Sequence, residues 1–80
     1  MAREVLDARN LLCPLPVIRT QDRVARLAPG DVLEVHATDP GALNDIPAWC
    51  RVSGHRVLEA CERPDGLVVV VIEVGDGAGG

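Results

Sequence analysis

The sequence has no phenylalanine and no tyrosine, and Trp49 is the one aromatic residue among its 80 residues. Its apolar residues are mostly valine, leucine, isoleucine and alanine, so we expect an aliphatic core. A chain of this length can bury enough surface for one small domain, which excludes a separate substrate-binding domain. We therefore expect a single two-layer domain over residues 1–74.

Lysine is also absent, and eight arginines against twelve acidic residues leave a net charge of −4. Nucleic-acid binding draws most of its affinity from clustered positive charge, so we expect no direct nucleic-acid ligand. The sequence has neither a signal-peptide pattern nor an apolar run approaching the roughly 20 residues that a membrane-spanning helix needs. We expect a cytoplasmic protein that binds no membrane.

Cysteine is scarce, and the three that occur are Cys13, Cys50 and Cys61. Three thiols cannot all pair within one chain, so at least one is expected to be free. They lie too far apart for a Cys-x-x-Cys pair, and adding His36 and His55 gives no recognisable zinc spacing. We therefore expect no metal site.

Alternating apolar and polar residues predict two strands, and two further strand-like runs follow near the end of the chain. Their expected ranges are 4–8, 31–38, 55–62 and 67–74. The turn-rich segment 63–66 between the last two favours an antiparallel hairpin. Asn10, just after the first strand, stands in a turn where it can take a positive φ.

The first helix is predicted from Pro14 to near Ala28, because proline fits a first helical turn and Pro29-Gly30 ends a helix. Helical spacing sorts its residues into a packed side and a solvated side. The packed side is expected to carry Val17, Gln21, Val24 and Ala28, flanked by Thr20, Leu27, Ile18 and Ala25. The solvated side is expected to carry Arg19, Arg23 and Arg26.

Asp39-Pro40 has the pattern of a helix start, with Asp39 as the cap, but Pro47 could not sit deep inside a continuous helix. The second helix is therefore predicted to follow a separate turn at 40–44. Asp45 is the expected cap and Pro47 lies in the first turn. The helix is expected to end near Ser53, with Gly54 as a left-handed cap. The predicted element order is β-α-β-α-β-β.

Cys13 stands directly before the first predicted helix and is the candidate functional residue. A thiol reacts as its thiolate, and the positive end of a helix favours negative charge, so we expect Cys13 to ionise readily. Pro14 and Pro16 remove donors from the first turn and stiffen the backbone that presents the sulfur. The alternative is that Cys13 is a small buried core residue.

Two groups of residues near Cys13 could dock a partner. Three leucines either belong to the core or form an apolar patch that a partner covers. Three arginines either form a docking strip for an acidic partner or are an ordinary solvated face. The leucines are Leu11, Leu12 and Leu15, and the arginines are Arg19, Arg23 and Arg26.

The last predicted strand is apolar on both faces, which indicates either that it is buried in the centre of the sheet or that its outer face is exposed and prone to associate with other chains. With helices on one face of the sheet, we expect Leu67, Val69 and Val71 to be partly exposed. Because such exposed apolar side chains can associate weakly, we expect the chain to be a monomer or a weak homo-oligomer. Cys50 and Cys61 have either packing roles or redox and resolving roles.

The segment Cys13-Pro14-Leu15-Pro16 resembles the Cys-Pro-x-Pro signature of the TusA (SirA-like) family of sulfur carriers. The resemblance covers about residues 4–74, because further segments look like the family's later landmarks in the same order. These segments are 6–8, 11–12, 29–31, 38–40, 45–50 and 54–55.

The resemblance implies an α/β two-layer sandwich in which two helices cover one face of a four-stranded mixed sheet. It is similar to the C-terminal domain of translation initiation factor three. It also implies that Cys13 holds sulfane sulfur as a persulfide, taken from a cysteine desulfurase or a rhodanese and passed to a DsrE-like protein. The pathway implied is tRNA thiolation or dissimilatory sulfur oxidation, with no cofactor beyond the covalent persulfide sulfur.

An exposed thiol without a base, oxyanion site or cofactor pocket cannot complete a reaction cycle. We therefore expect a carrier that acts with partner sulfurtransferases, not an enzyme. One alternative is a noncatalytic regulatory or redox-sensing module of the same fold. The terminal Gly79-Gly80 suggests a second alternative, a ubiquitin-like thiocarboxylate carrier, but those folds open with a β-hairpin. Residues 75–80 are expected to form a frayed tail.

Overall fold

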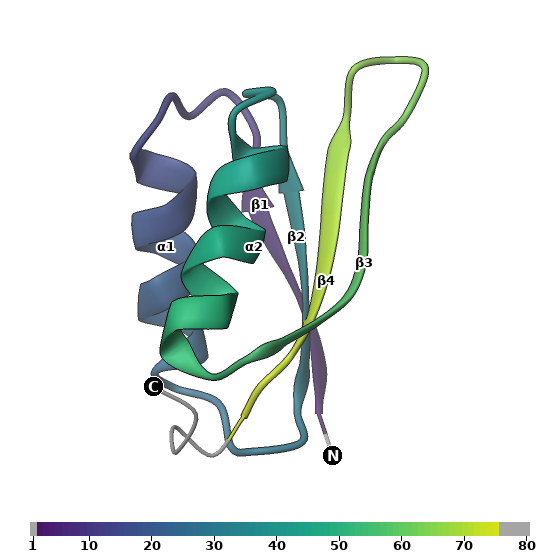
Figure 1. Ribbon diagram of the computed structural model, residues 1–80. Coiled ribbons are helices and arrows are strands. Elements are labelled where there is room, and N and C mark those ends of the chain that lie inside the picture. Colours follow the sequence, from purple (N-terminus) through teal and green to yellow (C-terminus); the bar gives the residue numbers. More distant parts are fainter. Residues whose placement is uncertain (1, 76–80) are drawn as a thin grey trace.

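The computed structural model describes residues 2–75, which form two layers (Figure 1). The strands are β1 (Arg3–Ala8), β2 (Val32–Ala37), β3 (Arg56–Glu62) and β4 (Val68–Glu73). The helices are α1 (Leu15–Val24) and α2 (Ala42–Ser53). No helix in this part of the chain has the length and apolar character to cross a bilayer.

The four strands form one mixed sheet in the order β1-β2-β4-β3. β1 and β2 are parallel, and β4 runs antiparallel to both of its neighbours, β2 and β3. A parallel pair needs a crossover connection, which α1 supplies, and both helices lie on the same face of the sheet (Figure 1). This arrangement confirms the predicted element order, the mixed sheet and the β3–β4 hairpin.

α1 is shorter than predicted, and its buried side matches the predicted one only in part. It ends at Val24 instead of Ala28, because the amides of Arg26 and Leu27 bond to carbonyls three residues back. The buried residues of α1 are Pro16, Thr20 and Val24. The Thr20 hydroxyl donates to the Pro16 carbonyl at 2.8 Å, which makes burial of this polar side chain possible. Val24 therefore packs as predicted, and the centre of the buried side is shifted from the predicted one toward Thr20 and Pro16.

Of the residues predicted to pack, Gln21 and Ala28 are exposed and Val17 is half-buried. The sequence pattern missed the burial of Pro16, because this proline was interpreted as a helix-start residue and not as a core residue.

α2 is one continuous helix from Ala42, so the prediction of a separate turn followed by a cap at Asp45 was wrong. Pro47 lies inside the helix and removes one backbone hydrogen bond. Three buried residues spaced four apart, Ala42, Ile46 and Cys50, hold the helix against the sheet despite that loss. The helix ends as predicted, with a left-handed cap at Gly54 (φ 83°).

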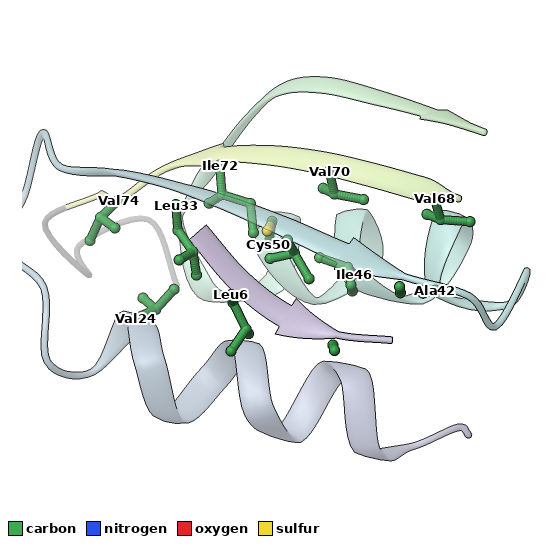
Figure 2. Close-up of a cluster of buried hydrophobic side chains, with 13 residues drawn as sticks. Leu6, Val24, Leu33, Ala42, Ile46, Cys50, Val68, Val70, Ile72 and Val74 are labelled. Atoms are coloured by element: carbon green, nitrogen blue, oxygen red, sulfur yellow. The ribbon is translucent and has the colours of Figure 1, made fainter. Parts of the chain in front are cut away.

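β4 lies between β2 and β3 and is buried on both faces. Val68, Val70 and Ile72 face the helices in the core shown in Figure 2. On the other face Val69 is 2% exposed and Val71 is 7% exposed, so the prediction of partial exposure was wrong for both. The strand register places side chains of β2 and β3 on either side of them, and these cover the valines. Leu67 is half-buried, as predicted.

Gly75 is packed, contrary to its predicted place in a frayed tail. Its amide donates to His55 Nδ1 at 3.0 Å, and a Cβ atom at this position would lie 2.0 Å from the Gly54 carbonyl oxygen. A side chain cannot be accommodated there without moving backbone. Residues 76–80, the rest of the predicted tail, lie outside the described residues.

Replacing Ile46 by alanine is expected to lower the free energy of unfolding by about 2–5 kcal/mol, because the Ile46 side chain is fully buried under the sheet. Val52→Ala in the same helix is the matched control, since Val52 is 75% exposed and its loss should change stability by less than about 0.5 kcal/mol. Urea unfolding followed by circular dichroism measures both. Equal losses in the two variants would contradict the packing described here.

Stability is expected to fall in acid partly through Asp31, whose carboxylate accepts hydrogen bonds from the amides of Ala2 and Ala28. These bonds lower the pKa of Asp31 below its ordinary value of 3.8. A carboxyl whose pKa is lower in the folded state stabilises the fold above its unfolded pKa and loses that effect as the pH falls through the folded pKa. Thermal melts between pH 2 and 6 should show a shallower acid slope for Asp31→Asn, and an identical slope would contradict the assignment.

Candidate functional site

Cys13 lies in the loop between β1 and α1, at the end of the sheet where the parallel strands β1 and β2 both finish (Figure 1). It directly precedes Pro14, the residue that caps α1, so it is the neighbour of the cap and not the cap itself. The Cys13 side chain is exposed, which excludes the buried alternative. The peptide bond between Cys13 and Pro14 is cis. Of the two prolines in the Cys-Pro-x-Pro segment, Pro14 is exposed, whereas Pro16 lies in the first turn of α1 and is buried.

Asp39 joins the Cys13 loop to the loop between β2 and α2. One of its carboxylate oxygens accepts the Cys13 backbone N–H at 2.8 Å, and the other accepts the Gly41 N–H at 3.0 Å. Nearby, the Asn10 N–H donates to the Thr38 hydroxyl at 2.8 Å. Asn10 has the positive φ predicted for it, 66°. Hydrogen bonds from one loop to the other therefore fix the backbone that presents the thiol.

The Cys13 thiol donates a hydrogen bond to Asp45 Oδ2 over 3.5 Å. This bond raises the pKa of Cys13 above its ordinary value, and partial desolvation and the charges of Asp45 and Asp39 raise it further. The prediction of a readily ionised thiol was therefore wrong. The first turn of α1 offers few free donors to an anion, since Pro14 and Pro16 have no N–H.

The three predicted leucines separate into a packed one and two exposed ones. Leu11 packs against the core, whereas Leu12 is 73% exposed and Leu15 is 40% exposed. Ile18 follows Leu15 by one helical turn and is also exposed, although the sequence placed it beside the packed side. We call Leu12, Leu15 and Ile18 the apolar patch; it lies next to Cys13 in the chain.

The three predicted arginines are not equivalent. Arg23 is half-buried and forms an ion pair with Glu4 of β1 at 3.1 Å, which ties α1 to the sheet. Arg19 and Arg26 are exposed, and together with Asp22, Arg23 and Leu6 of β1 they line a small hollow. Arg23 thus has a structural partner, while docking by Arg19 and Arg26 stays a prediction.

All three thiols are free, as at least one was expected to be. Cys50 is fully buried in the core, and desolvation raises its pKa to about 11, which explains it as a packing residue. Cys61 is half-buried on β3, where its thiol lies 3.6 Å from the Glu59 carboxylate. Neither contacts Cys13 through a hydrogen bond among residues 2–75, and their redox roles remain untested predictions.

The two histidines lie away from Cys13. His36 bonds to the Glu34 carboxylate on the outer face of β2. His55 accepts the Gly75 amide and packs its ring on Trp49, with the ring centres 5.1 Å apart. The Trp49–His55 pair lines an open hollow of about 350 Å³ at the carboxyl ends of both helices. Within residues 2–75 no three histidine, cysteine or acidic side chains form a cluster that could hold a metal ion.

Sequence reasoning missed Asp39 and Asp45 as parts of the site, because both were interpreted as helix caps. The predicted topology could have indicated that these residues lie near Cys13. Loops that follow the carboxyl ends of neighbouring parallel strands meet at one edge of a sheet. Residues following β2 should therefore have been expected next to Cys13, which follows β1.

Asp39→Ala is expected to destabilise the fold by about 1–2 kcal/mol, because two backbone donors lose their shared acceptor. The Cys13 amide should also exchange its hydrogen faster in this variant. Urea unfolding and hydrogen exchange measure the two effects. Asp22→Ala, an exposed change on α1, should change the free energy of unfolding by less than about 0.5 kcal/mol and leave the exchange rate of the Cys13 amide as it was. Unchanged exchange at Cys13 in Asp39→Ala would contradict the tether.

The chain is similar in sequence to several proteins that are named as sulfur carriers. The putative sulfur carrier protein YrkI of Bacillus subtilis is 48% identical over 62 residues, covering 78% of this chain and 83% of that protein. The putative sulfur carrier protein NMA0882 of Neisseria meningitidis is 45% identical over 73 residues, covering 91% of this chain and 97% of that protein. The sulfur carrier protein TusA of Pseudomonas aeruginosa is 47% identical over 58 residues, covering 72% of this chain and 73% of that protein.

The fold is also similar to a solved one. The crystal structure of a SirA-like protein from Desulfitobacterium hafniense superimposes with a TM-score of 0.80 at 26% identity, covering 91% of this chain and 99% of that one. The model of the family described as sulfurtransferase TusA matches residues 4–74, which span all six helices and strands described above except the first residue of β1. The chain therefore belongs to the TusA family.

Proposed function

We propose that this chain is a sulfur carrier that holds a persulfide on Cys13 and passes it between partner proteins. The observation that supports this most is the placement of Cys13: an exposed thiol on a backbone held by Asp39, next to the apolar patch. Relatives that cover most of this chain carry the name sulfur carrier protein. A thiol presented in this way can reach into the site of another protein.

Loading is a sulfur exchange without net oxidation. The Cys13 sulfur attacks the outer sulfur of a donor persulfide, R–S–S⁻, and forms a new S–S bond while the donor's S–S bond breaks. The thiol proton of Cys13 ends on the departing donor sulfur, so the products are Cys13–S–S⁻ and R–SH. The proposed donor is a cysteine desulfurase or a rhodanese, because both present such a persulfide.

The chemistry of transfer is assigned to the partners and not to this chain. The groups next to Cys13 are the carboxylates of Asp39 and Asp45, which cannot stabilise negative charge as it develops on sulfur. A partner must therefore supply the positive charge or hydrogen-bond donors of the transition state. We propose a DsrE-like protein as the acceptor, with tRNA thiolation or dissimilatory sulfur oxidation as the pathway served, in the cytoplasm.

A redox-sensing role for Cys13 is less well supported. Sensor cysteines have low pKa values and are oxidised as thiolates, whereas the Asp45 carboxylate raises the pKa of Cys13. The geometry therefore favours exchange under the control of a partner over spontaneous oxidation. The noncatalytic alternative predicts that Cys13 takes up no sulfur.

Incubation with a cysteine desulfurase and cysteine is expected to increase the mass of the protein by one sulfur atom, and a reducing agent should reverse the change. Cys13→Ser should abolish the gain, because the carrier sulfur is lost. Cys61→Ser is the matched control and should keep it, since Cys61 lies on β3. Intact-protein and peptide mass spectrometry measure the adduct and its position. A rhodanese with thiosulfate serves as a second donor, and absence of the adduct with both donors would refute the proposal.

A further inference from the structure

Asp45 is the side chain that accepts a hydrogen bond from the Cys13 sulfur in the described part of the chain. It lies in the first turn of α2, on a different element from the thiol, and it is exposed to solvent. The second charged group that acts on the sulfur is Asp39, from the loop before α2. Both are acidic, and the arginines of α1 are not among the groups that shift the pKa of Cys13.

A carboxylate beside a thiol stabilises the protonated form. The S–H group donates to Asp45 Oδ2, whereas a thiolate would bring a second negative charge to the same place. The start of α1 opposes this only weakly, because Leu15 N–H is already bonded to the Leu12 carbonyl and Pro16 has no N–H to offer. The free carrier therefore rests with Cys13 as a neutral thiol.

We propose that Asp45 is a positioning residue that holds Cys13 as a thiol in the free carrier and releases it when a cationic side chain of a partner pairs with the Asp45 carboxylate. This inference extends the sulfur-carrier function proposed above. The cation removes the acceptor of the thiol hydrogen bond and offsets the negative charge beside the sulfur. A partner lacking such a cation would meet an unreactive thiol, so Asp45 restricts sulfur exchange to matched partners.

The same carboxylate favours unloading. A persulfide is more acidic than its parent thiol, so the loaded form Cys13–S–S⁻ places an anion beside Asp45 and Asp39. On unloading, an acceptor thiol R′–SH forms a bond to the outer sulfur, the bond from Cys13 to that sulfur breaks, and the products are R′–S–S⁻ and Cys13–SH. The acceptor's proton ends on Cys13, which again donates to Asp45. Asp45 therefore stabilises the product of unloading relative to the loaded form.

The first test is the pH profile of Cys13 alkylation by iodoacetamide, read at the Cys13 peptide by mass spectrometry. Asp45→Asn keeps an oxygen acceptor and removes the charge, so we expect its profile to shift to lower pH and its rate at neutral pH to rise severalfold. Asp22→Asn makes the same charge change on α1 and should leave the profile where it is. Asp45→Glu should restore most of the original profile, which a purely structural role of Asp45 would not explain.

The second test concerns the cation. Asp45→Arg places a positive group where a partner's cation would lie, and we expect faster alkylation than in Asp45→Asn, with the difference reduced by added salt. Unfolding midpoints of all variants are measured alongside, so that a loss of structure is recognised. Equal rates in these two variants would overturn the role of the cation, and superimposable profiles of Asp45→Asn and the original would overturn the whole proposal.

The third test uses the loaded protein. After persulfide loading of Cys13, release of sulfur to N-acetylcysteine should be several times slower from Asp45→Asn than from the original chain. Equal release would overturn the unloading role of Asp45. If neither protein can be loaded, the sulfur-carrier function itself fails, while the alkylation profiles still decide whether Asp45 controls the thiol. The two failures are thus distinguishable.

Discussion

The geometry of the site depends on the two hydrogen bonds that the Asp39 carboxylate accepts, one from the Cys13 amide and one from the Gly41 amide. These bonds join a loop that follows β1 to a loop that follows β2, and the parallel pairing of those strands brings the loops to the same edge of the sheet. Without this contact, the Asn10–Thr38 hydrogen bond would be left to join the loop that carries the thiol to the loop after β2. With it, the pairing of β1 and β2 holds the two loops together and so fixes the position of the sulfur relative to Asp45.

Much of the fold was predictable because it depends on short-range patterns. Alternation in β2, the turn at 63–66 and the left-handed positions of Asn10 and Gly54 all follow from the residue types and their immediate neighbours. Errors arose where packing overrides local preference. Pro47 is tolerated inside α2 because buried neighbours hold that helix, and Thr20 is buried because it can bond to a carbonyl of its own helix. Neither compensation is visible in a sequence pattern.

The chemistry of the site was less predictable than its location. The Cys-Pro-x-Pro segment identified Cys13, but its ionisation was judged from the adjacent helix. The groups that control it, Asp39 and Asp45, are 26 and 32 residues further along the chain. Tertiary structure brings them to the sulfur, and their direct contact outweighs a helix start whose donors are partly removed by proline. Reactivity of the thiol is thus a property of the assembled fold and not of the motif.

The close approach of Gly75 to Gly54 has a practical consequence for handling this protein. β4 runs opposite to β1 and β2, so its end lies at the pole of the domain opposite to Cys13. The Gly75–Gly54 contact anchors the chain at that pole, where an added side chain would strike backbone. A fluorophore, affinity handle or surface linker joined to the chain directly after Gly75 would then start at the pole remote from the sulfur, and immobilised protein would still present its thiol to solvent.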